Sequence, residues 1–365
     1  MIEISDKKLC SGCTACASIC PVNCISMERD EEGFLYPVVD MSRCIKCGLC
    51  EKICPILNRQ VDTKHKPRAY ALVHKDLDIR MNSSSGGAFS LLADYVLDKG
   101  GVVFGASFDE KFNVCHTYIE NKEDLQKLRA SKYVQSDMRD SFKKAKELLD
   151  SGRLVLFTGT ACQIGGLKSY LRKDYDNLIT QDLICHGVPS PLVWEKYLEY
   201  RYSKAHAKIQ EISFRDKHLG WLLFSMRMKF ANNKTYRKSH ITDPMFIMFL
   251  FNKCLRPCCY ACSFKTITRQ CDITLADFWG VNSVCRKMND GKGVSLVLIH
   301  TKKGEEIFNA IKDKANYLEV PFDKAVAHNE MYTKSVSEKK VREKFFKDLS
   351  RLPFSKMIRK YGRLI

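Results

Sequence analysis

Two cysteine runs with the same spacing are the strongest chemical feature of this sequence. CSGCTACASICP begins at Cys10 and recurs as CIKCGLCEKICP at Cys44. The spacing C-x2-C-x2-C-x3-C-P is the one with which bacterial-type ferredoxins bind cubane clusters, and the last cysteine of each run binds the other cluster. We therefore expect two [4Fe–4S] clusters. The predicted ligands are Cys10, Cys13, Cys16 and Cys54 for cluster one, and Cys44, Cys47, Cys50 and Cys20 for cluster two.

Zinc and structural thiols are the alternatives for these two runs. Zinc sites usually use pairs of CxxC knuckles that lie far apart, whereas each run here places four cysteines within eleven residues. We therefore interpret the runs as iron–sulfur ligands. Cys24 lies outside the repeated spacing, and we expect it to be a small buried apolar residue.

A third group of cysteines lies in KCLRPCCYACSFKTITRQC, residues 253–271. Its spacing is not that of a ferredoxin run. The group is compatible with a third cluster that has a distant fourth thiolate, with a zinc ion, or with free thiols, and we favour the cluster. For the fourth ligand we select Cys185, in LICHGVPSP, and keep Cys271 and Cys162 as alternatives.

Two loops of small residues stand at the starts of predicted helices. One is SSSGGAF, from Ser83, and the other is FTGTACQIGG, from Phe157. The N-terminus of a helix favours a phosphate, so two such loops at the carboxyl ends of strands predict a cradle for a nucleotide-like cofactor. Neither loop is a G-x-G-x-x-G or a Walker motif, and ordinary helix capping is the simpler interpretation.

Five further side chains are candidates for cofactor contacts or for chemistry. Lys132 and Tyr133, in SKYVQS, offer a phosphate contact and a stacking ring, although such a pair is more often on the surface. Cys162 at a helix start is expected to have a lowered thiol pKa, unless it simply packs against the turn. His116 and His186 are candidate proton carriers, with ordinary polar contacts as the alternative.

The elements that must position these residues divide the chain into four parts. Residues 1–60 have almost no apolar core, so we expect a small domain that its metal holds together, with a hairpin strand in GFLYPVVD. Residues 61–67 are polar, end at Pro67 and predict a linker. Residues 68–330 are the main domain. Residues 331–365 form a basic tail.

Short apolar runs and helical patterns alternate in the main domain. AYALVH, GVVFGASF, RLVLFT and NLITQDLI predict strands, each followed by a helical pattern, and residues 209–230 alternate like an antiparallel pair. This alternation predicts a mixed or largely parallel sheet. The fold class is therefore α+β or α/β, with a small bacterial-type ferredoxin domain followed by a larger mixed-sheet α/β domain.

The charge balance bears on partners. The 365 residues carry a formal net charge of +18, and from about Lys334 the tail has the pattern of a basic amphipathic helix. We expect that helix to pack on the domain with a solvated basic face, with docking to a partner or to an anionic membrane surface as the alternative. An acidic redox partner or an anionic cofactor also matches the basic surplus. The sequence contains no recognisable nucleic-acid-binding motif.

Location follows from the absence of other patterns. The sequence contains no run of 18 apolar residues and no apolar leader at its start, so we expect neither a transmembrane segment nor a secretory signal, and we predict a cytoplasmic protein. In a reducing compartment, the 18 cysteines are expected to be metal ligands or catalytic thiols rather than disulfides.

Seven motifs, taken together, resemble one family. SSSGGAFS, GGVVFGASF, SKYVQS, LFTGTACQ, DLICHGVPSP, CLRPCCYAC and DITLADFWG are similar to the beta subunit of coenzyme F420 hydrogenase/dehydrogenase. The resemblance is to the bacterial branch that is fused to a ferredoxin domain and often occurs among polysaccharide-synthesis proteins. It extends from Cys10 to about His300. The sequence departs from the family at Thr160-Ala161-Cys162, where a proline usually precedes the cysteine, and at Cys258, where serine is common.

The resemblance implies a flavin, FAD in the best-known members or otherwise FMN, that exchanges a hydride with a deazaflavin and single electrons with cubane clusters. It also maps the family's third cluster to Cys254, Cys259 and Cys262, to which we add Cys185. Flavin chemistry suits this task because a hydride carries two electrons and a cubane passes one. The predicted flavin-binding residues are Ser83, Ser84, Ser85, Gly86, Gly87, Lys132, Tyr133, Thr158, Gly159, Thr160 and Cys162.

We therefore predict an iron–sulfur flavoprotein oxidoreductase whose partner is a redox protein or a hydride-carrying small molecule. No catalytic acid or base is predicted, since hydride transfer to flavin depends on positioning. Two alternatives remain. One is an electron-relay subunit without a substrate of its own, and the other is an assembly protein of a polysaccharide pathway whose clusters are structural.

Overall fold

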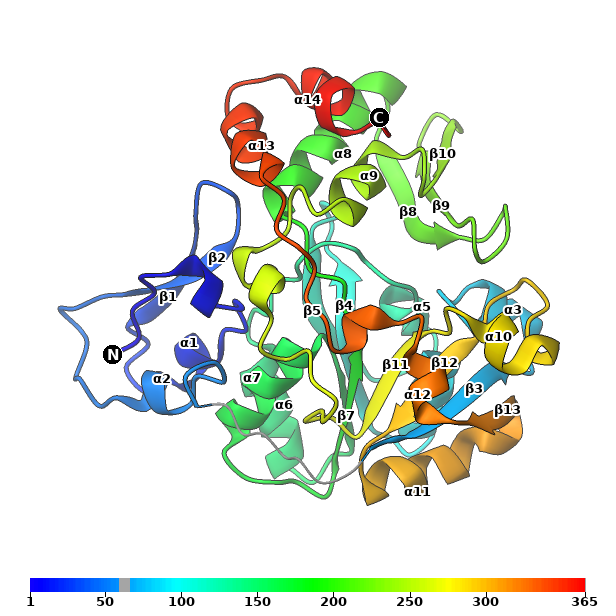
Figure 1. Ribbon diagram of the computed structural model, residues 1–365. Coiled ribbons are helices and arrows are strands. Elements are labelled where there is room, and N and C mark those ends of the chain that lie inside the picture. The colour runs from blue at the N-terminus through cyan, green and yellow to red at the C-terminus, as the bar shows by residue number, and fades with distance from the viewer. Residues whose placement is uncertain (59–65, 365) are drawn as a thin grey trace.

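The computed structural model describes residues 1–58 and 66–364 (Figure 1). Residues 59–65, which include most of the predicted linker 61–67, and residue 365 lie outside the described residues. Three sheets organise the rest: a two-stranded hairpin, an eight-stranded mixed sheet and a three-stranded antiparallel sheet. The fold is mixed α/β, with a small ferredoxin-like N-terminal region and a larger mixed-sheet domain, as the sequence predicts.

The N-terminal region holds two short helices and the hairpin. Strands β1 (Ile25–Arg29) and β2 (Leu35–Val39) pair antiparallel, which confirms the expected hairpin strand. Helices α1 (Ala15–Ile19) and α2 (Leu49–Lys52) each follow a cysteine loop. The two loops share a backbone shape, because Gly12 and Lys46 have φ of 68° and 55°, and Thr14 and Gly48 have φ of 67° and 72°.

The eight-stranded sheet has the strand order β13-β3-β12-β11-β7-β6-β4-β5. The neighbours β4, β6, β7 and β11 are parallel, and β5, β12 and β13 run antiparallel to their neighbours. Four strands lie where the sequence predicts them. The bounds are β3 (Arg68–His74), β4 (Val102–Phe108), β5 (Val114–Ile119), β6 (Val155–Thr158), β7 (Leu178–Leu183), β11 (Ile273–Asp277), β12 (Ser295–Ile299) and β13 (Ala315–Val320).

Helices cover both faces of this sheet. Leu156 on β6 packs with α4 (Ala88–Leu97) and α11 (Lys302–Ile311), whereas its neighbours Val155 and Phe157 pack with α6 (Ser141–Asp150) and α7 (Ala161–Leu171). Alternate residues therefore reach opposite cores, and β6 is buried along its whole length. The other small helices are α3 (Leu77–Met81), α5 (Leu125–Leu128), α10 (Val281–Cys285) and α12 (Phe322–Val326).

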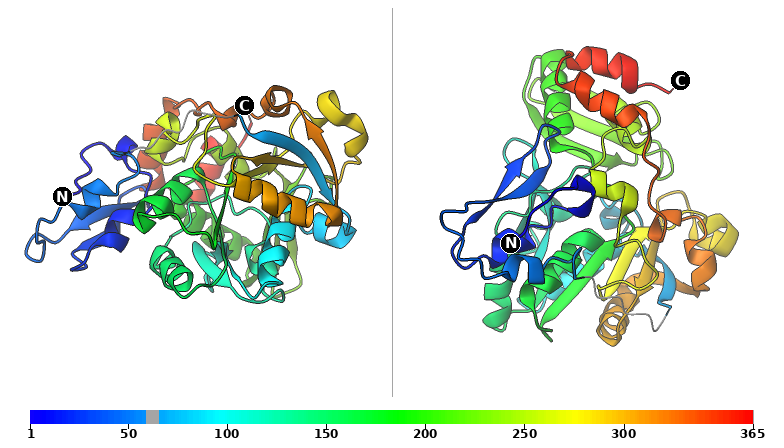
Figure 2. Two further views of the ribbon diagram at one scale, coloured as in Figure 1. Left: turned by 90° about the horizontal axis from the view of Figure 1, so that it is seen from below. Right: turned by 60° about the vertical axis from the view of Figure 1, so that its left-hand side comes forward.

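The N-terminal region packs on the α6 and α7 face. Ala15 and Ile53 belong to the same buried cluster as Phe142 and Ile164. Phe34 from the hairpin lies edge-on to Phe346, with ring centroids 6.4 Å apart. Both views of Figure 2 show this region beside the main domain. The module is therefore joined to the rest by shared apolar cores.

A second lobe carries the three-stranded sheet (Figure 1). Strands β8 (Ile209–Asp216), β9 (Ser225–Phe230) and β10 (Thr235–Ser239) confirm the predicted antiparallel pair and add a strand. Helices α8 (Pro191–Ala205) and α9 (Pro244–Leu250) pack with them in one core. No helix within residues 1–58 and 66–364 is both long and apolar enough to cross a bilayer.

The basic tail forms two helices and not the single one that its pattern suggests. Helix α13 (Val341–Leu349) and helix α14 (Phe354–Tyr361) are separated by Pro353, which caps the second helix and cannot continue the first. Phe345 and Met357 are fully buried in the second lobe's core. The tail therefore packs on the domain, as the simpler interpretation of its pattern expects.

Candidate iron–sulfur and cofactor sites

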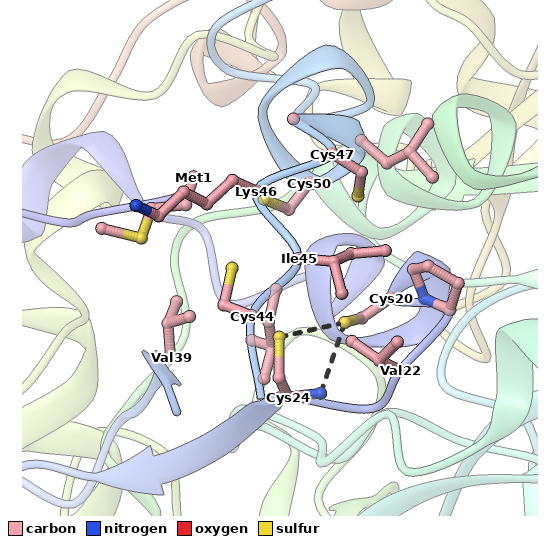
Figure 3. A pocket seen from close by; sticks show the side chains of 14 residues that line it. Met1, Cys20, Val22, Cys24, Val39, Cys44, Ile45, Lys46, Cys47 and Cys50 are labelled. Atoms are coloured by element: carbon pink, nitrogen blue, oxygen red, sulfur yellow. Dashed lines mark hydrogen bonds between the residues drawn. The ribbon is translucent and has the colours of Figure 1, made fainter. Parts of the chain in front are cut away.

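The structure brings the predicted ligands of the two clusters into two separate pockets. One pocket has about 360 Å³ of unfilled space, open solvent included, and its lining contains Cys10, Cys13, Cys16 and Cys54. The other has about 350 Å³, and its lining contains Cys20, Cys24, Cys44, Cys47 and Cys50 (Figure 3). Each predicted set thus gathers in one place, including the cysteine that comes from the opposite run.

The chemistry of the first pocket fits an iron–sulfur core. Burial, together with the nearby thiolates of Cys10 and Cys54, raises the pKa of the Cys13 thiol to about 11. Burial and neighbouring thiolates raise the pKa of the Cys16 thiol further. Positively charged iron at the centre removes this cost. The hydroxyl of Thr14 is buried in the same lining without a hydrogen-bond partner among the described residues, and it can donate to a cluster sulfide.

A single metal ion fits less well. Within the described parts of the chain, no three His, Cys, Asp or Glu side chains converge closely enough to hold one ion. A cubane does not require such convergence, because each of its four thiolates binds a different iron. The four predicted ligands in the lining of each pocket match the number of thiolates that a cubane binds.

Hydrogen bonds to sulfur differ between the pockets. In the second pocket the amide of Ile2 donates to Cys50 Sγ at 3.2 Å, and the amide of Cys24 donates to Cys20 Sγ at 3.3 Å. In the first pocket the guanidinium of Arg256 lies 3.5 Å from Cys10 Sγ. Hydrogen bonds and charge near the sulfurs are among the factors that set the potential of a cluster.

The third cysteine set comes from three distant segments. Cys162 lies in the first turn of α7, Cys185 follows β7, and Cys259 and Cys262 lie in and just after a short 3-10 helix (Pro257–Ala261). Burial first, and then the charges of Cys262, Cys185 and Cys259, raise the pKa of the Cys162 thiol, so the expectation of a lowered pKa at this helix start is wrong. Because these charges act on Cys162, the four cysteines lie near one another. The amide of Val188 donates to Cys259 Sγ at 3.5 Å.

Cys254 and Cys271 have different surroundings from Cys162. Cys254 is fully buried in the second lobe's core; burial raises its pKa to about 12, and no other cysteine contributes to that shift. It precedes Leu255, which pairs with Pro189 in an isolated bridge. Cys271 faces Thr274, with Sγ 3.4 Å from Oγ1. The main charges that act on Cys162 thus come from Cys185, Cys259 and Cys262, whereas the predicted ligand Cys254 packs in the apolar core that also contains Cys258 and Cys259.

Arg256 connects the first pocket to the third cysteine set. Its side chain is fully buried, and it donates to the carbonyl oxygens of Cys10 at 2.8 Å and Leu35 at 2.9 Å. Burial alone would lower its pKa, but the negative charges of Cys10 and Cys258 raise it. The amide of Cys259 donates to the carbonyl of Arg256 at 3.0 Å. One residue therefore contacts both cysteine sets.

The two small-residue loops lie at the same edge of the large sheet. Ser295 on β12 pairs with Asp277 at the end of β11 and with Leu72 near the end of β3. The parallel strands β6, β7 and β11 end at this same edge, so residues 83–87 and 158–162 follow the carboxyl ends of β3 and β6. This is the location that the sequence predicts for a cofactor.

The serine loop is anchored closely to the sheet. Ser85 Oγ donates to the carbonyl of Val294 at 2.7 Å, and the amide of Gly86 donates to Ser295 Oγ at 3.0 Å. A Cβ at Gly86 would lie 2.2 Å from the carbonyl oxygen of Leu72, so only glycine fits there. Gly87, with φ of 94°, caps α4. The hydroxyls of Ser83 and Ser84 bond to Ile79 and Ser131.

The second loop is a capped helix start. Thr158 Oγ1 donates to the carbonyl of Phe104 at 2.8 Å, and Thr160 forms a capping box with Gln163. A Cβ at Gly159 would lie 3.0 Å from Gln163 Oε1. Buried His116 bonds to the carbonyl of Thr158 at 2.9 Å, and burial lowers its pKa to about 4. His186 lies away from this loop and bonds to Asn252 at 2.7 Å.

Lys132 and Tyr133 have protein partners. The ammonium of Lys132 donates to the carbonyls of Lys127 at 2.8 Å and Arg129 at 3.0 Å, and burial lowers its pKa to about 7. The hydroxyl of Tyr133 accepts from Arg215 Nη1 at 2.8 Å. Both therefore support the loops around the sheet edge.

The sequence analysis missed two buried cations that hold the serine loop. Arg215 pairs with Asp277 at 2.7 Å and donates to the carbonyl of Ser84 at 2.8 Å. Lys217 donates to the carbonyl of Ser85 at 2.7 Å, and burial lowers its pKa to about 7. Arg215 lies near the end of β8, where the β8–β9 register shifts between Ser213 and Asp216, and Lys217 follows the strand, so no period in the sequence marks either cation as buried.

Three family models match the chain. Residues 9–57 match the 4Fe-4S dicluster domain. Residues 69–143 match the N-terminal model, and residues 152–325 the C-terminal model, of the coenzyme F420 hydrogenase/dehydrogenase beta subunit. The N-terminal model precedes the C-terminal model along the chain, and together the two cover more than half of the chain.

Two individual proteins are similar to this chain. The coenzyme F420-dependent sulfite reductase of Methanocaldococcus jannaschii is 27% identical over 331 residues, which are 86% of this chain and 47% of that protein. The chain thus spans about half the length of this curated relative. A chain of the F420-reducing [NiFe] hydrogenase complex of Methanosarcina barkeri aligns with 75% of this chain and 93% of its own length, at 17% identity and a TM-score of 0.49.

Proposed function

Because the chain belongs to the coenzyme F420 hydrogenase/dehydrogenase beta-subunit family and carries a 4Fe-4S dicluster domain, we propose that it is a flavin-dependent oxidoreductase that exchanges electrons between a hydride carrier and iron–sulfur clusters. Its membership in an iron–sulfur oxidoreductase family is the premise. The flavin, the carrier and the number of clusters are the proposal. The name of the relative from Methanocaldococcus jannaschii suggests a deazaflavin as the carrier.

The observation that carries the proposal is the succession of three cysteine sets. The second pocket lies at the outside, where Cys47 is exposed and Ile45 is 61% exposed. The first pocket lies against the main domain, because a Cβ at Gly166 of α7 would be 3.0 Å from Cys13 Sγ. Arg256 then connects Cys10 to Cys259. A partner protein at the outer end would reach the main domain through this succession.

We assign a third cubane to Cys162, Cys185, Cys259 and Cys262. Each set contributes four thiols, and the third faces the start of α7, next to the loop at residues 158–162. The chain therefore offers a one-electron site within the main domain, beside a predicted phosphate-binding loop. Cys258 is adjacent, and its thiol donates to Cys259, which lowers the pKa of Cys259.

A flavin bound at the sheet edge would convert between a two-electron hydride and single electrons. The chain's own groups would position it. Backbone amides at the starts of α4 and α7 would bind the phosphates of the flavin. Arg215 and Lys217 would keep the serine loop in place by donating to the carbonyl oxygens of Ser84 and Ser85. The packing of the loops on the sheet fixes where a ring can lie.

Anaerobic purification followed by iron, sulfide and flavin analysis tests this proposal. We expect about 12 iron atoms per chain, from three cubanes, together with FAD or FMN. About 8 iron atoms and no flavin would overturn both the third cluster and the flavin. If flavin is present, its reduction by a deazaflavin or by another hydride donor would be followed as bleaching of the flavin absorbance.

A further inference from the structure

Arg256 is a buried cation without a carboxylate partner. Its side chain is fully buried where the N-terminal module meets the main domain. Arg215 and Arg342 are also buried, and each forms an ion pair, with Asp277 and Glu32 respectively. Arg256 forms no ion pair within the part of the chain that the structure describes. Because an unpaired buried charge is costly, its countercharge must come from another kind of group.

The hydrogen bonds of Arg256 lead to one predicted cluster ligand. Nε donates to the carbonyl of Cys10 at 2.8 Å, and Nη1 donates to Gln135 Oε1 at 3.0 Å. Nη2 donates to the carbonyl of Leu35 at 2.9 Å and lies 3.5 Å from Cys10 Sγ. The three oxygens are neutral. The thiolate of Cys10, in the ligand set of cluster one, is therefore the negative group that the guanidinium contacts.

The first cysteine run leaves space for this guanidinium. A Cβ at Gly12 would lie 2.8 Å from Arg256 Nη1, so a larger residue there would displace the cation. The ring of Tyr36 lies on the guanidinium, with its centroid 4.2 Å from Arg256 Cζ. Water is therefore kept away from the charge, and its attraction for a nearby negative charge is screened only weakly.

The second run provides a matched comparison. The repeat offset of 34 residues, from Cys10 to Cys44, places Lys46 opposite Gly12. Lys46 is exposed, and among the described residues it is the one basic side chain in the lining of the second pocket. Solvent and salt screen an exposed charge. A buried cation thus contacts a ligand of cluster one, whereas the basic side chain beside cluster two is solvated.

We propose that Arg256 is a positioning residue whose buried charge stabilises the reduced form of cluster one and leaves cluster two unaffected. When cluster one takes an electron from a neighbouring cluster, that donor is oxidised and cluster one gains a negative charge. No bond is made or broken, and no proton moves. Attraction to the guanidinium favours this reduction, so the electron settles against the main domain. The inference rests on the clusters and the electron transfer of the proposed function.

Redox titration of the full chain, purified anaerobically and followed by electron paramagnetic resonance, tests the proposal. Cys13→Ser and Cys47→Ser each change a ligand of one cluster and so assign the signals. In Arg256→Met, the ratio of reduced to oxidised cluster one at a fixed potential should fall about tenfold, a shift of about 59 mV to more negative potential, because the lost charge is weakly screened. Cluster two should keep its potential.

Three control variants separate charge from packing. Arg256→Lys keeps the charge, so its cluster one should shift less than in Arg256→Met. Arg342→Met loosens the same joint, because Arg342 donates to Glu32 Oε1 at 2.8 Å and to the carbonyl of Leu255 at 2.9 Å, and it should leave both potentials unchanged. Lys46→Met removes the exposed charge and should leave the potential of cluster two almost unchanged.

An unchanged potential of cluster one in Arg256→Met would overturn the proposal. Equal shifts in Arg256→Lys and Arg256→Met, or the same shift in Arg342→Met, would also overturn it, because hydrogen bonding or packing would then account for the effect. If Arg256→Met does not accumulate as a folded chain, Gln135→Glu takes its place. This variant keeps the side-chain volume and gives Arg256 a carboxylate partner, so cluster one should again shift to more negative potential, and no shift would contradict the role of Arg256.

Iron and flavin analysis of the same preparations separates this inference from the proposed function. Fewer than about 8 iron atoms per wild-type chain would contradict the ligand sets themselves. A cluster-one potential that depends on Arg256 in a chain without flavin would contradict only the flavin. A chain that contains flavin, but whose cluster-one potential does not depend on Arg256, would contradict only this inference.

Discussion

The N-terminal cysteine sets and the third cysteine set are built in opposite ways. The first two come from short loops around small helices and a two-stranded hairpin, which bury little apolar surface of their own. The third is brought together by the end of β7, the start of α7 and a segment packed between two lobes. We expect that a metal holds the loops in the first case and that the fold holds the cysteines in the second. On this expectation, the chain combines a module that depends on metal with a scaffold that folds without it.

Removal of iron should have the largest effect, and it should affect the N-terminal module much more than the main domain. We expect anaerobic chelation to unfold residues 1–58 while the large sheet stays folded, because structural metals contribute on the order of 10 kcal/mol to small domains. Hydrogen exchange measured by mass spectrometry would show amides of β1 and β2 exchanging freely and those of β6 and β7 still protected. Equal loss of protection in both regions would contradict the distinction.

Substitution of a cysteine in the third set should remove a cluster without unfolding the scaffold. Cys162→Ala is expected to lose up to about four iron atoms per chain, whereas Cys254→Ala should keep them all. Iron analysis and the melting of the sheet domain would be measured together. The opposite result, with iron lost only in Cys254→Ala, would restore the ligand set that the sequence alone suggests.

Arg256 tests the joint between the two regions. Arg256→Met leaves the carbonyl oxygens of Cys10 and Leu35 without their donor, and each buried unsatisfied group costs about 1–3 kcal/mol. We expect the free energy of unfolding to fall by about 3 kcal/mol and protease cleavage between the module and the main domain to accelerate. Arg351→Met, at an exposed site, is the control and should change neither quantity.

Protonation of His116, in the main domain, should have the smallest of these effects on stability. Its pKa falls from 6.5 to about 4 on folding because of burial, so the unfolded chain binds a proton that the folded chain does not. Stability is therefore unaffected above pH 6.5 and decreases as the pH falls toward 4. Between pH 7 and pH 5.5 we expect a loss of about 1 kcal/mol in the free energy of unfolding, measured by denaturant titration. His116→Gln should lose less over the same range.

The sequence predicted what depends on local spacing. The ligands of the first two clusters lie within short runs, and the strands of the large sheet are apolar runs of ordinary length, so both were accessible from pattern alone. The third set was accessible in part, because the motifs supply Cys185, Cys259 and Cys262 and leave Cys162 as an alternative ligand, but spacing alone does not decide between Cys162 and Cys254. Proximity along the chain favours Cys254, which packs in the apolar core that also contains Cys259, so the choice between Cys254 and Cys162 stays a prediction.

The buried contacts of three cations could not be predicted from the sequence either. Arg215 and Lys217 look like part of a charged surface strand, yet both are buried against the serine loop. Arg256 lies in the motif CLRPCCYAC, but its contacts with Cys10 and Leu35 depend on how the N-terminal module packs on the main domain. Such contacts follow from the packing of distant elements, which a period or a spacing does not encode.

The shared backbone of the two cysteine loops has a consequence for protein engineering. Each loop needs two left-handed positions, and each run supplies only one glycine, Gly12 in the first and Gly48 in the second. The counterparts Lys46 and Thr14 adopt the same conformation at a cost of about 1 kcal/mol or more each. The two halves thus hold complementary parts of a better sequence, and a module with glycine at all four positions would be a more robust electron-carrying tag to graft onto other scaffolds.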